Sequence, residues 1–248
     1  MKLTLLVAFF VFTIGVSAQE TIPPGTVIPA RLNSTLSAKS RPGEKISARV
    51  MQNVPLFGDS KIPAGSRLDG HVVSVAAGPG GHGTSITFVM DKLIVRHRLI
   101  PVLCDLRALA SPLEIDDAQI PAMGPDRGTP PSAYTTVQVG GDEVVYRGGG
   151  HVMNTSEVVG EPVPGGILGR AQPYATCRGS MDGNDQPQAF WVFSTDACGV
   201  YGFPGLTIDH LGRNDPKGKI ILSTKGNLKI YGGSALLVRV MASGKVGT

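Results

Sequence analysis

Residues 42–75 read PGEKISARVMQNVPLFGDSKIPAGSRLDGHVVSV, and this segment decides the fold. Residues 45–50 alternate polar and apolar side chains, which is the period of a strand with one buried face. Pro63 fixes its own φ and Gly65 accepts a left-handed conformation, so the sequence PAGS predicts a tight turn. The segment therefore predicts two strands connected through a loop and a turn.

The same pattern recurs along the chain. A second Pro-Gly corner at 23–26 precedes a run with strand character at 26–32, and further alternation follows at 85–90. Short strand–turn–strand patterns return at 206–211 and 219–241. Short strands with short connections are typical of a meander that closes into a barrel or sandwich. We expect an all-β protein, a single distorted antiparallel β-barrel or sandwich with a long Gly/Pro-rich insertion and at most one short helix.

Three local features refine this expectation. Pro29 lies inside the strand at 26–32, and because proline cannot donate to a β-ladder, we expect this strand at a sheet edge or at a bend. The extended run at 93–106 is expected to break near Pro101. A further strand is expected at 190–193 (FWVF), the most aromatic run of the chain.

The first residues have the pattern of a targeting signal. Lys2 precedes an almost unbroken apolar run at 3–16, and residues 16–18 (VSA) fit a small-residue cleavage site. A bilayer-spanning helix needs about 20 apolar residues, so the run is short for a permanent anchor, which is the alternative. We expect a signal peptide at 1–18, cleavage after Ala18, a secreted or periplasmic location and no membrane span after cleavage.

The strand pattern divides the mature chain. Residues 19–108 are expected to form the N-terminal half of the barrel, and residues 190–243 the strands that complete it, followed by a tail at 244–248. Between them, residues 109–189 are rich in glycine and proline and lack strong periodicity. A segment of this length is a functional loop, a covering flap or a disordered insertion, and we expect any binding surface there.

Weak secondary structure is expected inside this insertion. Ser111 as N-cap and Pro112 at the first helical position predict two helical turns over 113–120. Short strands are expected at 136–139 and 143–147.

The charge of the chain is mildly basic. Lysine and arginine number 23 against 19 aspartates and glutamates, for a net charge of +4. The basic residues are scattered along the expected strands, whereas nucleic-acid binding calls for a concentrated patch with interleaved aromatic residues. We therefore interpret them as solvated strand faces and expect no nucleic-acid partner.

The three cysteines predict one disulfide. In an oxidising compartment two of them should pair. Cys177 and Cys198 flank a Gly- and Asp-rich segment, and closing such a loop stabilises by roughly 3 kcal/mol. Cys104 lies in an apolar surrounding that suits a small buried thiol. We expect a Cys177–Cys198 disulfide and a free Cys104, with pairing of Cys104 to either of the others as the alternative.

Recognisable catalytic or metal-binding motifs are not evident in the sequence. The five histidines are widely separated and do not have the spacing of metal ligands. No Gly-x-Ser-x-Gly elbow or phosphate-binding loop occurs in its usual context. We expect no metal, no cofactor and no catalytic residue, so an enzyme is the minority interpretation.

A small set of residues is proposed for binding. Trp191 and Tyr201 lie near the expected disulfide loop, beside Asp182, Asn184 and Asp185. Exposed aromatic residues next to such polar groups suit a glycan or a protein partner. The alternative is that the aromatic residues of 190–193 belong to the core, and that the Asp/Asn cluster is an Asx-turn rather than a calcium site.

The turn and strand motifs resemble a known family. The sequence PGTVIPA at 24–30, ISARV at 46–50 and IPAGSRLDG at 62–70 are similar to the C-terminal β-barrel of TrbI-like proteins, components of conjugation or type IV secretion channels. The resemblance covers 22–75 and implies a distorted barrel of the bacterial envelope that packs against copies of itself or against envelope partners. The remainder resembles uncharacterised secreted proteins of acidobacteria.

Two functions follow from these patterns. The first is a secreted or periplasmic, non-catalytic β-barrel protein that acts as an envelope assembly or binding module. The second is an extracellular carbohydrate-binding module or hydrolase that uses the insertion and the disulfide loop.

Overall fold

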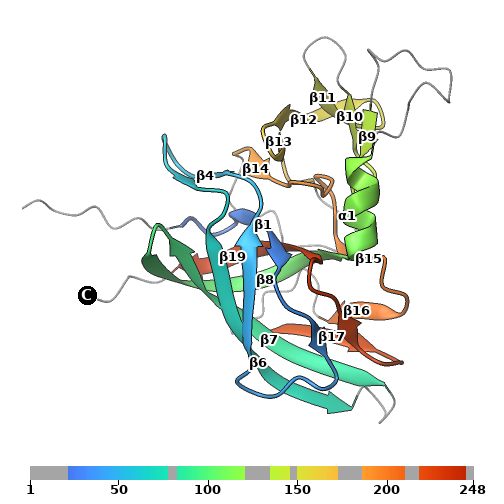
Figure 1. The fold of residues 1–248 in the computed structure, drawn as a ribbon. Coiled ribbons are helices and arrows are strands. Elements are labelled where there is room, and N and C mark those ends of the chain that lie inside the picture. The colour runs from blue at the N-terminus through green and yellow to red at the C-terminus, as the bar shows by residue number, and fades with distance from the viewer. Residues whose placement is uncertain are drawn as a thin grey trace, which may run out of the picture.

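A computed structural model of the protein describes residues 22–77, 83–120, 135–145, 150–172, 186–209 and 218–243. Six strands close into an antiparallel ring, in the order β8 (Arg98–Ala110), β19 (Ala235–Ser243), β1 (Val27–Leu32), β3 (Lys45–Val50), β6 (Arg67–Ala77) and β7 (Thr84–Val95) (Figure 1). The ring closes where residues 92–95 of β7 pair with residues 98–101 of β8. The expected all-β fold with a distorted barrel is therefore confirmed.

Alternation of side chains explains the barrel wall. In β3 the apolar residues Ile46, Ala48 and Val50 are buried, whereas Lys45 and Arg49 between and beside them are exposed. The inward residues of the six strands form one hydrophobic cluster. Burying them removes apolar surface from water, at roughly 25 cal/mol per Å², and closing the ring removes open sheet edges.

Two details of the strand prediction are wrong. β1 lies between β19 and β3, not at a sheet edge. The pairing of β1 with β3 begins at Ala30, one residue after Pro29. The N–H that proline lacks is therefore missing only at the end of the β1–β3 hydrogen-bond ladder, where it is tolerated. The run at 93–106 breaks not at Pro101, which pairs with Lys92, but at a two-residue turn formed by Arg96 and His97.

The long strands continue past the closed ring. The first half of β7 pairs with β17 (Ile220–Thr224), which pairs with β16 (Leu206–Asp209), and β15 (Gly199–Tyr201) runs parallel to the end of β8. Two small ribbons complete this part of the molecule. They are β2 (Leu36–Ser37) with β18 (Lys229–Ile230), and β4 (Val54–Pro55) with β5 (Lys61–Ile62).

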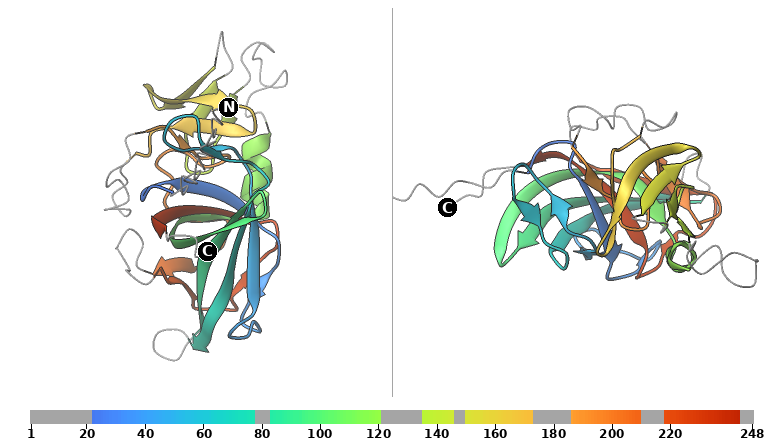
Figure 2. Two further views of the ribbon diagram at one scale, coloured as in Figure 1. Left: turned by 90° about the vertical axis from the view of Figure 1, so that its left-hand side faces the viewer. Right: turned by 90° about the horizontal axis from the view of Figure 1, so that it is seen from above.

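The insertion contains a second sheet. Its strands are β9 (Thr135–Val137), β10 (Glu143–Val145), β11 (His151–Asn154), β12 (Glu157–Val163), β13 (Gly166–Gly169) and β14 (Gln188–Ala189), paired in chain order. This sheet lies against the barrel, as two directions of view show (Figures 1 and 2). The two strands expected here correspond to β9 and β10, and the other four were not foreseen.

The single helix of the described residues is the predicted one. α1 (Pro112–Gln119) has Ser111 as N-cap, whose hydroxyl accepts a hydrogen bond from the Glu114 N–H at 3.3 Å. Ile115 and Ala118 of α1 are buried in a second hydrophobic cluster, together with residues of the second sheet. Within the part of the chain that the structure covers, no helix is both long and apolar enough to cross a membrane.

The segment 190–193 is not a strand. It forms a turn in which Phe190 and Phe193 are fully buried and Trp191 is 6% exposed. Its aromatic side chains fill the second hydrophobic cluster, between the second sheet and the outer side of β1, β8 and β19. The interpretation of these aromatic residues as core is therefore the one that the structure supports.

Candidate functional site

Three arginines face outward side by side on the barrel. Arg31 of β1 is the register partner of Arg49 of β3, and Arg49 is the partner of Arg67 of β6. Neighbouring strands lie about 4.8 Å apart and directly opposed residues share a face, so the three side chains form a row across the wall. All three are exposed.

The members of this row differ in their contacts. Arg31 Nε donates a hydrogen bond to the Gly233 carbonyl at 3.1 Å. Arg67 Nε lies 2.9 Å from Asp69 Oδ1 and 3.0 Å from Oδ2. The side chain of Arg49 makes no hydrogen bond or ion pair with any residue that the structure describes. The central guanidinium of the row thus retains its five donors for solvent or a ligand.

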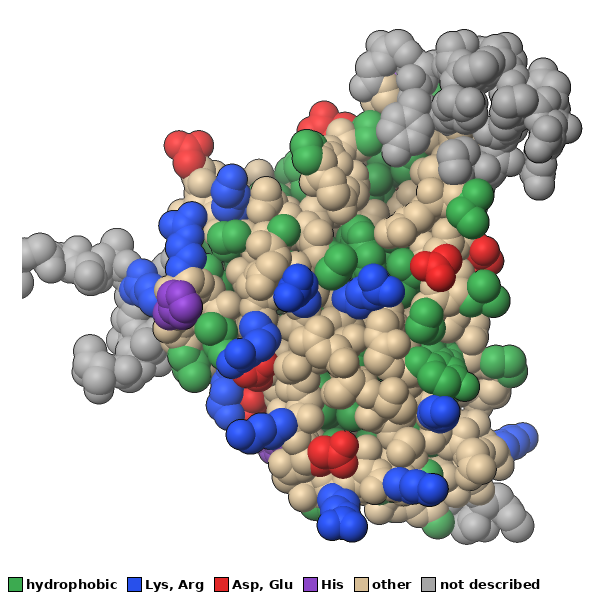
Figure 3. All heavy atoms as spheres, in the orientation of Figure 1, with side chains coloured by type: hydrophobic (Ala, Val, Ile, Leu, Met, Phe, Trp, Pro, Cys, Tyr) green, Lys and Arg blue, Asp and Glu red, His purple; other side chains and the backbone are tan. Residues whose placement is uncertain are grey.

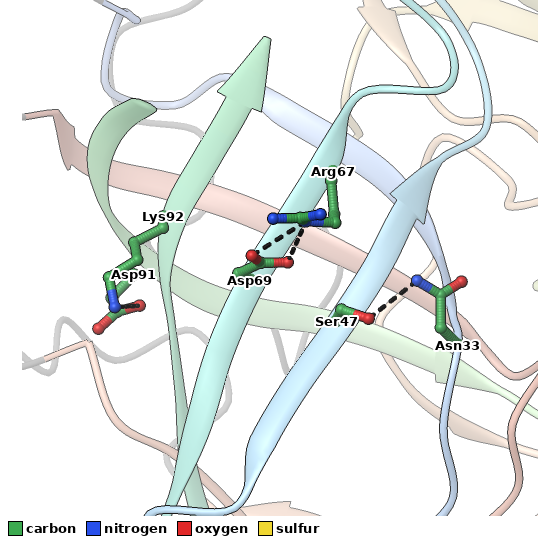
Figure 4. A network of polar contacts seen from close by, with 6 residues as sticks. All are labelled: Asn33, Ser47, Arg67, Asp69, Asp91 and Lys92. Carbon is green, nitrogen blue, oxygen red and sulfur yellow. Dashed lines mark hydrogen bonds and ion pairs between the residues drawn. The ribbon is translucent and has the colours of Figure 1, made fainter. Parts of the chain in front are cut away.

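A shallow groove lies beside the row. Its volume is about 610 Å³, and its polar lining comes from β3, β6 and β7: Lys45, Ser47, Arg67, Asp69, His71 and Lys92. Figure 4 shows Ser47, Arg67, Asp69 and Lys92 of this lining, together with Asn33 and Asp91. Asn33 Nδ2 donates to Ser47 Oγ at 3.0 Å, and the Asp91 carboxylate lies 3.6 Å from His71 Nδ1 and 3.9 Å from Lys92 Nζ.

The floor of the groove requires a glycine. At Gly70 the backbones of β6 and β7 approach so closely that a Cβ atom would lie 1.8 Å from the Val89 carbonyl oxygen. The register of the two strands shifts at this point, between Asp69 and Gly70. A bulge of this kind redirects neighbouring side chains, and here its extra residue is Asp91 of β7, which lies between the pairs Asp69–Lys92 and Gly70–Met90.

We define the basic face as Arg31, Lys45, Arg49, Arg67 and Lys92. Figure 3 shows Lys and Arg side chains gathered on this side of the molecule. Two carboxylates beside this face, Asp69 and Asp91, contact basic side chains. Like charges directly opposed on a sheet are destabilising, so the arginine row does not serve the stability of the barrel. Chemically, the face is suited to binding anions.

The residues proposed from the sequence lie elsewhere. Trp191 is buried, with φ 55°, and its backbone N–H donates to Gln52 Oε1 at 2.7 Å. It lines a hollow of about 330 Å³ between α1 and the second sheet, together with Gln119, Thr136 and Gln138. Tyr201 is half-buried and packs against the same hydrophobic cluster as Trp191.

The hydroxyl of Tyr201 is engaged locally. It accepts from the Cys198 N–H at 3.0 Å and lies 3.3 Å from the Cys198 carbonyl. Asp182, Asn184, Asp185 and Cys177 lie outside the described residues. The binding role of the first three and the Cys177–Cys198 disulfide therefore stay predictions.

The remaining cysteine is inert. Cys104 is free and fully buried among the inward residues of the barrel. Burial raises the pKa of its thiol to about 12, with the nearby charges of Asp105 and Asp91 acting in the same direction. The thiolate form is therefore scarce at neutral pH, and a nucleophilic role is excluded.

Buried polar side chains fasten the second sheet to the barrel. Gln52 Nε2 donates to the Ile167 carbonyl at 2.7 Å, and Gln188 Oε1 accepts from the Val27 N–H at 3.0 Å. Arg107 Nε donates to the Ala197 carbonyl at 2.8 Å. These buried hydrogen bonds connect the barrel to the second sheet and to the turn that follows it.

Arg107 is a buried cation. Its Nη2 donates to the carbonyls of Gln172 at 2.9 Å and Thr195 at 3.1 Å. Burial, reinforced by the charge of Arg239, lowers the pKa of Arg107 to about 10, against the opposing effect of Asp196. Arg107 is still protonated at neutral pH and acts as a structural donor.

Among the described residues no three His, Cys, Asp or Glu side chains are grouped so as to hold a metal. The basic face was missed by the sequence analysis because its members are distant in the chain. The register of β1 with β3 and of β3 with β6 places Arg31, Arg49 and Arg67 opposite one another, and this register cannot be read from their spacing in the sequence.

Comparison of the sequence with models of known protein families finds no match, and comparison with curated proteins finds none either. Among solved structures, ComB10 of the Com type IV secretion system of Helicobacter pylori is similar at 25% sequence identity and a TM-score of 0.26. The match covers 31% of this chain and 39% of the ComB10 chain, so this chain spans well under half of that protein. A partial similarity of this kind carries no argument about function, and the TrbI-like resemblance stays a prediction.

Proposed function

We propose that the protein is a secreted or periplasmic, non-catalytic β-barrel module that binds an anionic component of the cell envelope through its basic face. The observation that carries the proposal is the in-register row of Arg31, Arg49 and Arg67. The signal-peptide pattern at 1–18 supports the location.

The geometry favours a binding role over an assembly of identical copies through this face. Two basic faces brought together would repel each other, whereas an anionic partner would be attracted before contact. Because the arginines stand on strands of a closed barrel, their backbone is already ordered before binding, and the ordering cost of association is confined to their side chains.

The test is binding of inorganic polyphosphate, measured by titration calorimetry at low ionic strength. We expect the wild-type protein to bind and the affinity to fall as salt is added, because surface charges are screened. Arg49→Thr should bind about fivefold more weakly, since one basic residue at an anionic surface contributes about 1 kcal/mol.

A matched control removes the same charge elsewhere. Lys225 is exposed in the turn after β17, which pairs with the half of β7 away from the ring closure. Lys225→Thr should bind polyphosphate like the wild type. Equal affinities of the wild type, Arg49→Thr and Lys225→Thr would contradict the role of the basic face.

A second candidate function is recognition of a neutral glycan at the Trp191 hollow. Its lining combines an indole with the polar side chains of Gln119, Thr136 and Gln138, without a charged residue among the described lining. The volume of about 330 Å³ lies at the lower end of ligand sites. Because Trp191 is only 6% exposed, little of its ring is available for stacking. Glycan-array binding that is lost in Trp191→Ala, with an unchanged circular dichroism spectrum, would favour this function.

A further inference from the structure

The arginine row continues into an apolar pair. Arg67 is the register partner of Ile94 on β7, and Ile94 is the partner of Leu99 on β8. Register partners point to the same side of a sheet, so Ile94 and Leu99 share the outer side with the arginines. Leu99 is 43% exposed and Ile94 is partly exposed.

The pair stands at the base of a projecting hairpin turn. Arg96 and His97 form the turn with φ values of 47° and 69°. Two-residue turns with positive φ at both positions strongly favour Asn-Gly, because other side chains are strained there. Here the turn instead carries Arg96, which is exposed; Arg98 pairs with the buried Val95 and therefore belongs to the other side of the sheet. A basic side chain thus stands next to the aliphatic pair at a site where glycine would be the easier choice.

We propose that this side of the barrel docks on an anionic membrane surface, with Leu99 and Ile94 entering the interface and the arginines contacting lipid phosphates. The inference rests on the proposed function and names its partner. A dissolved polyanion would gain nothing from the exposed aliphatic pair. A bilayer interface takes both kinds of group, because arginine heads remain among the phosphates while apolar groups reach the acyl boundary.

The carboxylates on this side do not oppose docking. Asp69 is held by Arg67, and Asp91 lies between His71 and Lys92. Each is thus neutralised by a basic neighbour. Arg31, Lys45, Arg49 and Arg96 are the cations left to attract the surface, where each contributes about 1 kcal/mol.

The experiment is co-sedimentation of the purified protein with vesicles. One set contains phosphatidylglycerol mixed with phosphatidylcholine, and the other contains phosphatidylcholine alone. We expect binding to the first set only, weakened by added salt. Leu99→Ser should reduce it about fivefold, because an exposed part of a leucine no longer leaves water on docking, while binding of soluble polyphosphate stays unchanged.

The control for Leu99 is another exposed leucine. Leu113 is 67% exposed on α1, beyond the opposite end of β8. Leu113→Ser should bind vesicles like the wild type, and thermal unfolding should show that both variants are folded.

The outcomes separate the two proposals. If the wild type binds polyphosphate but not phosphatidylglycerol vesicles, or if Leu99→Ser binds vesicles as the wild type does, membrane docking is overturned and the proposed function stands. If the protein binds neither probe, both are overturned.

Discussion

The outer side of one barrel wall has two environments. The covered half consists of the parts of β1, β8 and β19 that pack against the second sheet and α1, where small or apolar side chains are buried: Val27, Ala108, Ala110, Ala235 and Leu237. On the bare half, formed by β3, β6 and β7, no other element of the described residues covers the outer side, and it carries Lys45, Arg49, Arg67 and Lys92. The covered half stabilises the fold by burying apolar surface. The bare half presents like charges on opposed residues, which is unfavourable for stability.

Two arginines make the difference concrete. Arg107, on the covered half, is 3% exposed and directs its donors at three backbone carbonyls. The side chain of Arg49, on the bare half, has no polar partner among the described residues. The same side chain is therefore a structural connector in one place and an available ligand group in the other.

The largest expected effect is that of Arg107→Met. The substitution leaves the carbonyls of Gln172, Thr195 and Ala197 without these donors in a buried setting. Loss of charged hydrogen bonds with buried acceptors left behind costs about 3 kcal/mol or more. Urea unfolding of the variant should show a correspondingly lower free energy of unfolding.

Arg49→Met is the matched control for this comparison. An exposed substitution without lost partners changes stability by within about 0.5 kcal/mol. If Arg107→Met and Arg49→Met lowered the free energy of unfolding by similar amounts, Arg107 would be no more important for stability than Arg49, and the contrast between the two halves would fail.

The next effect concerns the floor of the groove. Gly70→Ala places a methyl group against the Val89 carbonyl oxygen and forces β6 away from β7. Overpacking of this kind costs about 1–3 kcal/mol. Gly43→Ala is a useful contrast, because a Cβ atom there meets nothing within 4 Å and only its φ of 81° is unfavourable. Thermal unfolding that left Gly70→Ala more stable than Gly43→Ala would argue against a close strand contact.

Local chemistry explains what was predictable from the sequence. The alternation at 45–50, the Pro-Gly corners and the Ser111–Pro112 helix start are decided by neighbours in the chain, and each was confirmed. The run 190–193 was mistaken for a strand because burial selects aromatic residues whatever the backbone conformation.

The basic face could not be foreseen in the same way. Arg31 and Arg49 become neighbours only through the pairing of β1 with β3, and Arg67 joins them through β6. Scattered charges in a sequence thus become a row once the register is fixed. The second sheet was underestimated for a related reason, since its short strands contain glycines such as Gly160, whose Cβ would collide with the Leu168 carbonyl on the neighbouring strand.

A third effect is pH-dependent and tests the covered half. Asp142 is buried and accepts from the Thr195 N–H and Oγ1, both at 2.7 Å, and from Asn154 Nδ2 at 2.8 Å. Burial raises the pKa of its carboxyl group, although these hydrogen bonds act in the opposite direction. The folded protein then holds this proton more tightly than the unfolded chain does, so the contribution of Asp142 to stability falls as pH rises through the interval between the two pKa values.

Asp142→Asn isolates this contribution. The difference in free energy of unfolding, wild type minus variant, should be greater at about pH 3.5 than at about pH 7, because only the wild type loses the proton. Urea unfolding at both pH values gives the difference. A larger wild-type advantage at the higher pH would mean that the hydrogen bonds outweigh burial.

The smallest effect is the most informative about the bare half. Arg49 lies directly between Arg31 and Arg67, and like charges opposed on a sheet destabilise it by a few tenths of a kcal/mol per pair. Arg49→Thr keeps a good strand former and should raise the free energy of unfolding by about 0.5 kcal/mol at low salt. The gain should vanish near 1 M salt, where the screening length is about 3 Å, and Arg49→Lys should show no gain at any salt concentration. Measured together with polyphosphate binding, a variant that is more stable and binds more weakly indicates that the arginine row is retained for its ligand. If Arg49→Thr lowered both the stability and the polyphosphate affinity, the role of Arg49 would instead be to stabilise the barrel.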